Sequence, residues 1–187
     1  MKALAQVPDF ARLAIFEPGI AGPFRGLLGA LPGYMKSFYW SDLASGEARN
    51  GVMSQDLMAL SLADASVDLV ITSDIFEHIR HPDRAFSEIS RILKPGGAHV
   101  FSIPVAVPHP AMTVARVDVS GPTDIHLLPE VYHGDGVGGR SLVYNDFGLD
   151  LLEALEKLGT PTHLHHYEVP ERPVNAAVAF ISVKRPV

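Results

Sequence analysis

Short apolar runs alternate along the chain with longer segments in which apolar residues recur every three or four positions. The short runs are typical of buried strands, and the longer segments are typical of amphipathic helices. The clearest strand is residues 67–73, whose nearly continuous apolar character suits a parallel strand buried on both faces. The clearest helix starts at Pro82 and ends at the breaker Pro95-Gly96-Gly97. The pattern therefore predicts an α/β fold.

The remaining elements continue this alternation over the whole chain. We expect strands at residues 13–16, 37–40, 52–54 and 99–105, helices at residues 24–31 and 146–158, and a terminal antiparallel pair at residues 163–169 and 175–185. Residues 104–143 are rich in Pro, Gly and His and show only weak periodicity. A stretch of this kind predicts a long substrate-side loop or cap within a single domain that spans residues 1–187.

Composition narrows the class of function. The chain has 187 residues and a formal net charge of −6, without a long basic run, which argues against nucleic acid and favours a small-molecule partner. It has no cysteine, which excludes disulfides, thiolate nucleophiles and cysteine metal sites. The first apolar stretch is interrupted by Asp9, Arg12 and Glu17, so we expect neither a signal peptide nor a membrane span and interpret the chain as cytoplasmic.

The segment at residues 61–104, SLADASVDLVITSDIFEHIRHPDRAFSEISRILKPGGAHVFSIP, carries two specific motifs, DIFEHI and RILKPGG. It resembles the central part of the class I S-adenosylmethionine-dependent methyltransferases, especially those that act on small molecules. The resemblance implies a Rossmann-like, doubly wound, seven-stranded sheet that is mostly parallel, with the last strand inserted antiparallel. It also implies S-adenosylmethionine as the cofactor.

The family's first motif, E-x-G-x-G-x-G, is only partly present. Glu17 and Gly19 match it, whereas Ala21 and Pro23 stand where the second and third glycines would be. Glycine matters at these positions because the backbone must turn sharply and approach the cofactor closely. Ala21 costs little, and Pro23 removes an N–H group but suits the first turn of a helix. A strand-to-helix turn without a cofactor is the alternative interpretation.

Four further positions match cofactor contacts of the family. Asp42 closes the second strand, where an acidic side chain can accept both ribose hydroxyls; a solvated turn aspartate is the alternative. Asp56 matches the acceptor of the adenine amino group, with Leu57 beside the ring, although Asp56 could instead cap a helix that starts at Leu57. Ser73 ends the fourth strand on the crevice side, where its backbone would contact the methionine part.

Asp74, Glu77 and His78 have the i, i+3, i+4 spacing that would gather three metal ligands on one helical face. Hydrogen bonds that tie this helix to its neighbours are the alternative, because buried polar groups are normally satisfied in that way. We favour the hydrogen bonds and predict no metal.

The resemblance places the acceptor after the fourth and fifth strands, so residues 104–143 are expected to form its wall. Methyl transfer mainly requires alignment of donor and acceptor and exclusion of water, and a base helps when the acceptor is a hydroxyl. His126 and His133 are the candidate catalytic residues, because the pKa of histidine lies near neutrality, and Asp135 is placed to orient an imidazole. Loop histidines that only bond local backbone are the alternative.

The sequence thus predicts methyl transfer from S-adenosylmethionine to a small-molecule acceptor, with oxygen favoured over nitrogen and carbon. One alternative is an inactive binding or scaffold subunit, which Ala21, Pro23 and the short amino-terminal region support. A partner subunit would then supply the missing lid. In the active interpretation, the missing lid favours a homodimer. The other alternative, a nicotinamide-dependent oxidoreductase, is disfavoured because no G-x-G-x-x-G follows the first strand.

Overall fold

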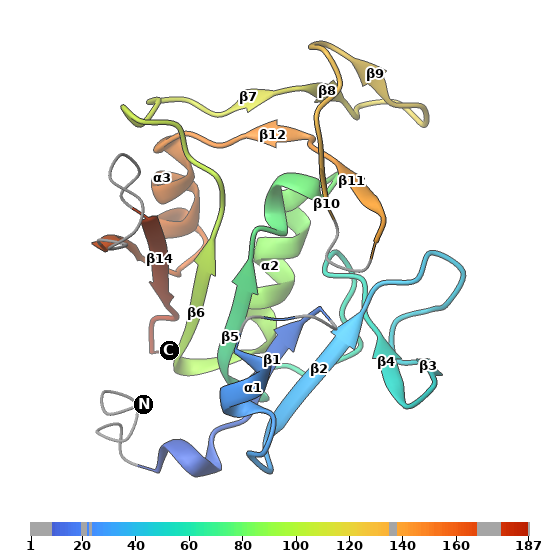
Figure 1. The fold of residues 1–187 in the computed structure, drawn as a ribbon. Coiled ribbons are helices and arrows are strands. Elements are labelled where there is room, and N and C mark those ends of the chain that lie inside the picture. Colours follow the sequence, from blue (N-terminus) through green and yellow to red (C-terminus); the bar gives the residue numbers. More distant parts are fainter. Residues whose placement is uncertain (1–8, 20–21, 23, 135–137, 168–176, 187) are drawn as a thin grey trace.

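One eight-stranded sheet organises the residues that the computed structural model describes, namely 9–19, 22, 24–134, 138–167 and 177–186 (Figure 1). Its strands lie in the order β13-β14-β6-β5-β1-β2-β4-β3. The strands are β1 (Ile15–Pro18), β2 (Tyr34–Phe38), β3 (Ala48–Arg49), β4 (Val52–Ser54), β5 (Val67–Ser73), β6 (Leu93–Ser102), β13 (Thr162–Tyr167) and β14 (Ala177–Val183).

The strand pairing confirms the predicted α/β class. The pairs β6–β5, β5–β1, β1–β2 and β2–β4 are parallel. The last strand, β14, is inserted antiparallel between β13 and β6, as the resemblance implied. The predicted seven strands become eight because the two-residue β3 pairs antiparallel with β4 at the far edge.

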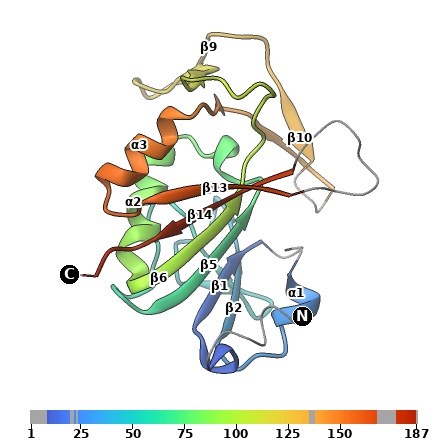
Figure 2. The same cartoon turned by 90° about the vertical axis from the view of Figure 1, so that its left-hand side faces the viewer.

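Helices cover both faces of the sheet, which explains the continuous apolar character of β5. Figure 2 shows α2 (Pro82–Ile92) and α3 (Asp150–Lys157) on one face and the short α1 (Arg25–Leu28) on the other. Successive residues of a strand point to opposite faces, and the buried residues follow this rule. Phe16 and Val70 join the larger core, which also contains α2 and α3 residues, whereas Ile15 and Ile71 pack with Leu28 of α1.

The helix boundaries differ from the prediction. Helix α2 ends at Ile92, so Pro95-Gly96-Gly97 does not end it and instead lies inside β6. This extension is stabilised by the carboxyl-terminal part of the chain, because the Gly96 N–H donates to the Lys184 carbonyl and the Lys184 N–H donates to the Gly97 carbonyl. Tertiary pairing therefore overrides the local breaker signal.

The other two helices are shorter than predicted. Helix α1 spans only four residues, because Gly26 within it and Gly29 directly after it disfavour a longer helix. Helix α3 begins at Asp150 because the preceding residues form β12 (Asn145–Asp146), which pairs with another short strand. The backbone at Gly148 also packs closely against Met112, since a Cβ on Gly148 would lie 2.3 Å from the Met112 carbonyl carbon. Only glycine fits at this position.

Residues 104–143, which we call the cap, form short antiparallel ladders beyond the carboxyl ends of β5 and β6 (Figure 1). The ladders pair β7 with β12, β8 with β9 and β10 with β11. The cap strands are β7 (Val114–Ala115), β8 (Val117–Asp118), β9 (Ile125–His126), β10 (Tyr132–Gly134) and β11 (Arg140–Leu142). The predicted loop thus has local structure of its own.

Among the described residues there are also two single-turn helices, η2 (Phe10–Arg12) before β1 and η3 (Phe76–His78) shortly after β5. Within the described ranges no helix is both long enough and apolar enough to cross a membrane.

Candidate functional site

A cavity of about 750 Å³ opens at the carboxyl ends of the parallel strands. Open α/β sheets bind ligands at this edge, and the volume falls within the roughly 300–1,000 Å³ typical of small-molecule sites. Its wall is built by the ends of β1 and β2, by the segments that follow β4 and β5, and by η3. Gly134, Ser141 and Tyr144 contribute the cap side of the wall.

Glu17 is buried at the end of β1 and fixes the turn that follows it. Its Oε2 accepts a hydrogen bond from the Tyr34 hydroxyl at 2.5 Å, and its Oε1 accepts one from the Phe24 N–H at 3.2 Å. Burial and the bond to Glu17 raise the pKa of Tyr34 above its ordinary value, so the phenol stays protonated. Both carboxylate oxygens of Glu17 are thus used in hydrogen bonds within the protein, and these bonds hold the turn against β2.

The local geometry of this turn requires glycine at two positions. Gly19 has φ +114°, a conformation that side chains strongly disfavour. A Cβ on Gly22 would lie 2.4 Å from the Glu17 carboxyl carbon, so a larger residue would displace that carboxylate. Ala21 and Pro23 lie outside the described residues.

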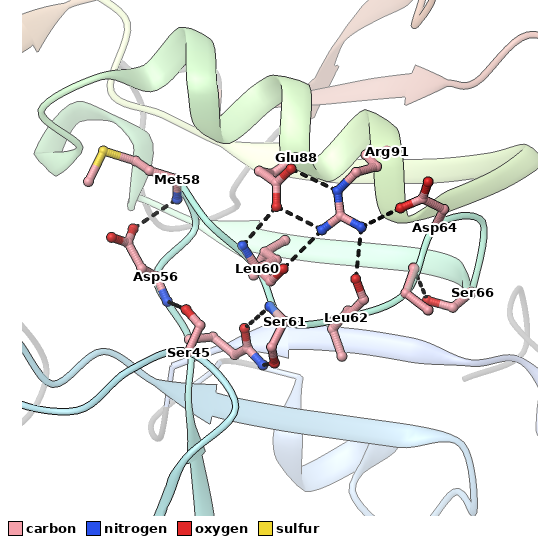
Figure 3. A network of polar contacts seen from close by, with 12 residues as sticks. Ser45, Asp56, Met58, Leu60, Ser61, Leu62, Asp64, Ser66, Glu88 and Arg91 are labelled. Atoms are coloured by element: carbon pink, nitrogen blue, oxygen red, sulfur yellow. Dashed lines mark hydrogen bonds and ion pairs between the residues drawn. The ribbon is translucent and has the colours of Figure 1, made fainter.

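Asp56 and Leu57 both line the cavity in the segment after β4. The Asp56 Oδ1 accepts the Met58 N–H at 2.8 Å, and the Asp56 N–H donates to the Ser45 hydroxyl at 2.9 Å (Figure 3). No helix begins at Leu57, so the helix-cap alternative is wrong, and Asp56 stabilises a tight turn. The adenine contact stays a prediction for a residue that the structure does place on the cavity wall.

An ion-pair network ties this segment to α2 (Figure 3). The Arg91 guanidinium donates to both oxygens of Glu88, to Asp64 and to the carbonyls of Leu60 and Leu62. The Glu88 Oε2 in turn accepts the Leu60 N–H at 2.8 Å. Arg91 holds the pKa of Glu88 below its usual value, because the bonds favour the ionised carboxylate. Helix α2 therefore positions the segment that carries Asp56 and Leu57.

Asp42 does not lie on the cavity wall. It is exposed, and its Oδ2 accepts a hydrogen bond from the Arg49 guanidinium at 2.7 Å, which lowers the pKa of the carboxyl. Phe38 and Tyr39 line the cavity at the end of β2 instead. The structure therefore does not bring Asp42 together with Asp56, and its ribose contact stays a prediction.

Ser73 ends β5 on the cavity wall, beside Ser102 of β6 in the strand register. The next residue, Asp74, has φ +50° and also lines the cavity. Its N–H donates to the Ser102 carbonyl at 3.0 Å, and its Oδ1 accepts the Ser102 hydroxyl at 3.1 Å. These bonds hold the backbone of both residues at the sheet edge, where the resemblance implies the methionine contact.

Glu77, His78 and His133 form a polar cluster at the other end of the cavity. The Glu77 Oε1 lies 3.5 Å from the His78 Nε2 and 3.6 Å from the His133 Nδ1. The two imidazole rings meet edge to face, with their centroids 5.0 Å apart. Burial raises the pKa of Glu77 to about 7 and lowers the pKa of His78. Neither carboxylate oxygen of Glu77 has a hydrogen-bond partner among the described residues.

This cluster differs from the predicted arrangement of Asp74, Glu77 and His78. Asp74 directly follows β5, and Glu77 and His78 lie on the single 3₁₀ turn after it, so no continuous helical face gathers the three. The favoured hydrogen bonds are present for His78, whose Nδ1 lies 2.8 Å from the Leu142 carbonyl, and for Asp74, which bonds to Ser102, but not for the Glu77 carboxylate among the described residues. His133 joins the cluster through the β10–β11 ladder, and no sequence signal links it to Glu77 across this separation.

The two candidate catalytic histidines lie apart. His126 is on the exposed strand β9, 3.5 Å from the Glu130 carboxylate, and it does not line the cavity. His133 does not line the cavity either, but its ring packs against His78, which does, and 40% of its side chain is exposed. Asp135 lies outside the described residues.

Arg80 and Tyr144 are cavity residues that the sequence did not single out. The Asp124 carboxylate joins them, because it accepts the Arg80 Nε–H at 2.7 Å and the Tyr144 hydroxyl at 2.9 Å. Burial and the Asp124 bond raise the pKa of Tyr144 to about 12, so the hydroxyl remains a donor at neutral pH. The Arg80 guanidinium also donates to the Gly121 carbonyl, and together these bonds fasten the cap over the cavity.

Comparison with known proteins agrees with this geometry. Residues 36–101 match the family model described as a methyltransferase domain. A malonyl-[acyl-carrier protein] O-methyltransferase of Methylococcus capsulatus is 46% identical over 52 residues, which cover 28% of this chain and 19% of that protein. A dimethylglycine N-methyltransferase of Parasynechococcus marenigrum is 47% identical over 45 residues, which cover 24% of this chain and 16% of that protein. The matched region is thus under a fifth of the length of these relatives.

The fold comparison extends over nearly the whole chain. An S-adenosylmethionine-dependent methyltransferase from Mesorhizobium loti superimposes with a TM-score of 0.60 at 20% identity, covering 98% of this chain and 96% of that one. The chain therefore has the fold of class I S-adenosylmethionine-dependent methyltransferases, and residues 36–101 carry the signature of their methyltransferase domain, as the resemblance predicted. These findings support S-adenosylmethionine as the cofactor.

Proposed function

We propose that the chain binds S-adenosylmethionine in the 750 Å³ cavity and transfers its methyl group to a small-molecule acceptor, with oxygen as the favoured atom. The observation that carries the proposal is the joint position of Gly19, Asp56, Leu57 and Ser73 on one cavity wall. These four residues come from three separate segments of the chain, and each matches a cofactor contact of the family. The cap closes the other side of the same cavity, where an acceptor would lie.

The residues on the wall fit this cofactor at its two ends. Asp56 would accept the adenine amino group with its carboxylate and Leu57 would cover the ring, since both line the cavity next to each other. Gly19 leaves the backbone bare for close approach, because nothing stands within 4 Å of the place a Cβ would occupy. At the ribose the fit is incomplete, because Asp42 pairs with Arg49 instead of facing the cavity.

S-adenosylmethionine supplies a methyl group that is already activated on a sulfonium, so the chain has to align the two reactants and exclude water. The Arg80–Asp124–Tyr144 bonds support exclusion of water by holding the cap in place. When the acceptor is a hydroxyl, a group that accepts its proton assists the reaction. His133 is the better placed of the two candidate bases, since its ring contacts His78 on the cavity wall and its side chain is 40% exposed, whereas His126 lies on the outer strand β9.

The curated relatives act on different atoms, since one is named as an O-methyltransferase and the other as an N-methyltransferase. The preference for oxygen therefore rests on the histidine beside the cavity. A methyl acceptor of this kind is uncharged or weakly charged, in keeping with the acidic balance of the chain.

A binding or scaffold subunit without activity is the second candidate function, and the position of Asp42 favours it. With Asp42 paired to Arg49, the aromatic residues Phe38 and Tyr39 occupy the end of β2 at the cavity. An acceptor screen separates the two candidates once cofactor binding is established.

The experiment is calorimetric titration of the purified chain with S-adenosylmethionine and S-adenosylhomocysteine. We expect micromolar binding of both and a loss of at least tenfold in the Asp56→Ala variant, or about 1.4 kcal/mol. The matched control is Asp83→Ala, which removes an exposed acid from the first turn of α2, away from the cavity. NADH serves as the negative ligand. Absence of binding by either sulfur ligand to a folded sample would contradict the proposal.

A further inference from the structure

The Glu77 carboxylate is buried without a hydrogen-bond partner in the part of the chain that the structure describes. The residue is 1% exposed, and both carboxylate oxygens lack a hydrogen bond among the described residues. Burying an unpaired carboxylate is costly, and native proteins almost always satisfy such groups with hydrogen bonds, counterions or metals. Glu77 is thus a buried acceptor in need of a positive partner.

Two imidazole nitrogens lie close to this carboxylate, one from His78 and one from His133. The His78 Nδ1 lies 2.8 Å from the Leu142 carbonyl oxygen, which can only accept, so the proton of a neutral His78 belongs on Nδ1. That tautomer leaves Nε2, which lies 3.5 Å from Glu77 Oε1, with a free lone pair that can bind a cation. Metal-binding histidines characteristically donate their second ring N–H to a carbonyl or carboxylate in this way.

We propose that Glu77, His78 and His133 bind a divalent transition-metal cation of the zinc class. One ligand atom from each residue lies within 4.8 Å of the other two. Metal–ligand bonds of about 2.1 Å in a tetrahedral site place the ligand atoms roughly 3.4 Å apart. The two distances to Glu77 Oε1, 3.5 Å and 3.6 Å, are close to that spacing. The site therefore needs only a small adjustment of the His133 side chain to close on an ion.

The ligand set selects the kind of cation. Two imidazoles and one carboxylate suit Zn²⁺, Fe²⁺ or Co²⁺, whereas Mg²⁺ and Ca²⁺ prefer oxygen ligands. Three protein ligands also leave the fourth tetrahedral position open, as in catalytic rather than structural zinc sites. Asp74 is not part of this set, since its carboxylate accepts the Ser102 hydroxyl. The structure thus pairs Glu77 and His78 with His133 instead of Asp74, and the expected hydrogen bonds, which favoured no metal, are missing at the Glu77 carboxylate among the described residues.

The open position faces the acceptor side of the cavity. His78 lines the cavity together with Gly134 and Ser141 of the β10–β11 ladder, and 40% of the His133 side chain is exposed. A cation held there would bind an oxygen of the acceptor and favour its ionised form. In the metal-loaded protein His133 is then a ligand instead of a base. This step rests on the proposed function, whereas binding of the cation does not.

The experiment is equilibrium dialysis of the tag-free chain against Zn²⁺, with elemental analysis of the retained metal, in the absence of any methyl donor. We expect one equivalent of Zn²⁺ per chain, and binding weakened by about 10- to 100-fold or more in Glu77→Gln and His133→Ala. The control is His163→Ala, an exposed histidine on β13 that leaves the cluster intact. Substitution with Co²⁺ adds a spectroscopic readout, because tetrahedral Co²⁺ with imidazole ligands absorbs strongly in the visible range.

The results separate the two proposals. The metal site would be overturned if the parent chain, shown to be folded by circular dichroism, retained no more Zn²⁺ than the His133→Ala variant. Equal loss in His163→Ala would overturn it as well, because the ion would then bind surface histidines. Stoichiometric Zn²⁺ binding in a chain that fails to bind S-adenosylmethionine would support the metal site and contradict the proposed function.

Discussion

Residues 61–104 and the cap, residues 104–143, lie on adjoining parts of the molecule and follow different rules. The first segment forms β5, η3, α2 and β6 and supplies most of the buried core. The cap exposes most of its large hydrophobic residues. Among its described residues, the buried hydrophobic side chains are those of Val117 and Val143. The first segment is therefore specified by periodic burial, whereas the cap is specified by particular polar contacts to the rest of the chain.

The largest expected effect of a single substitution lies in the periodic segment. Phe86 of α2 is buried and stacks on Phe76, with ring centroids 3.9 Å apart. Phe86→Ala leaves a cavity in the main core, so we expect the free energy of unfolding to fall by about 3–5 kcal/mol in urea titrations. The cap counterpart is Leu127→Ala, at a side chain that is 56% exposed, with an expected change within about 0.5 kcal/mol. Equal losses of unfolding free energy in the two variants would contradict the proposed difference between residues 61–104 and the cap.

Acid is expected to destabilise the same segment through His99 of β6. Burial lowers the pKa of His99 to about 3, and its Nε2 lies 2.9 Å from the Thr72 hydroxyl. The folded pKa is below the unfolded value of about 6.5, so this contribution to stability is complete above pH 6.5 and is lost as pH falls toward 3. Between pH 6.5 and pH 4.5 the loss amounts to about 2–3 kcal/mol.

The measurement is urea unfolding over this pH range for the parent chain and for His99→Gln, which can keep the Thr72 hydrogen bond without titrating. The difference between the two pH slopes isolates His99 from the other acids and bases. Parallel slopes would contradict a neutral, buried imidazole.

The glycine turn that follows β1 joins the central sheet to the wall of the cavity. Gly22→Ala places a Cβ 2.4 Å from the Glu17 carboxyl carbon and forces that carboxylate away from Tyr34 and Phe24. We expect S-adenosylhomocysteine to bind at least tenfold more weakly, a loss of about 1.4 kcal/mol, in calorimetric titration. Gly26→Ala in α1 is the matched control, because no atom lies within 4 Å of the added Cβ. Unchanged affinity in Gly22→Ala would place the cofactor elsewhere.

The smallest effect concerns attachment of the cap. Tyr144→Phe removes the hydroxyl that donates to Asp124 at 2.9 Å, which costs about 0.5–1.5 kcal/mol. We expect faster amide hydrogen exchange at residues 116–134 with unchanged exchange in β5 and α2. Tyr132→Phe, whose hydroxyl contacts only the exposed Glu130 in the same strand region, is the control. Faster exchange throughout the core would show that cap and core unfold together.

The fold could be predicted where burial is periodic. Strand β5 has the predicted bounds, 67–73, because it lies between two parallel neighbours with helices on both faces. The end of α2 could not be predicted, because Pro95-Gly96-Gly97 is a local breaker that pairing with Lys184 draws into β6. The order of the short cap strands was equally hidden, since each is two or three residues long.

The candidate site divides in the same way. Gly19, Asp56 and Ser73 follow predicted strands, so the common edge of a parallel sheet brings them to one cavity. Asp42 follows a strand too, but an ion pair with Arg49, seven residues later, holds it outside. His133 reaches Glu77 only through the β10–β11 ladder, a contact that no pattern in the chain encodes.

The most direct test of the account is amide hydrogen exchange of the chain with and without S-adenosylhomocysteine. Bound S-adenosylhomocysteine is expected to slow exchange at residues 17–19, 37–39 and 55–58, the donor end of the cavity, while α3 and the β13–β14 pair stay unchanged. Protection confined to the cap, or no protection at ligand concentrations that saturate a micromolar site, would contradict the assignment of this cavity to S-adenosylmethionine.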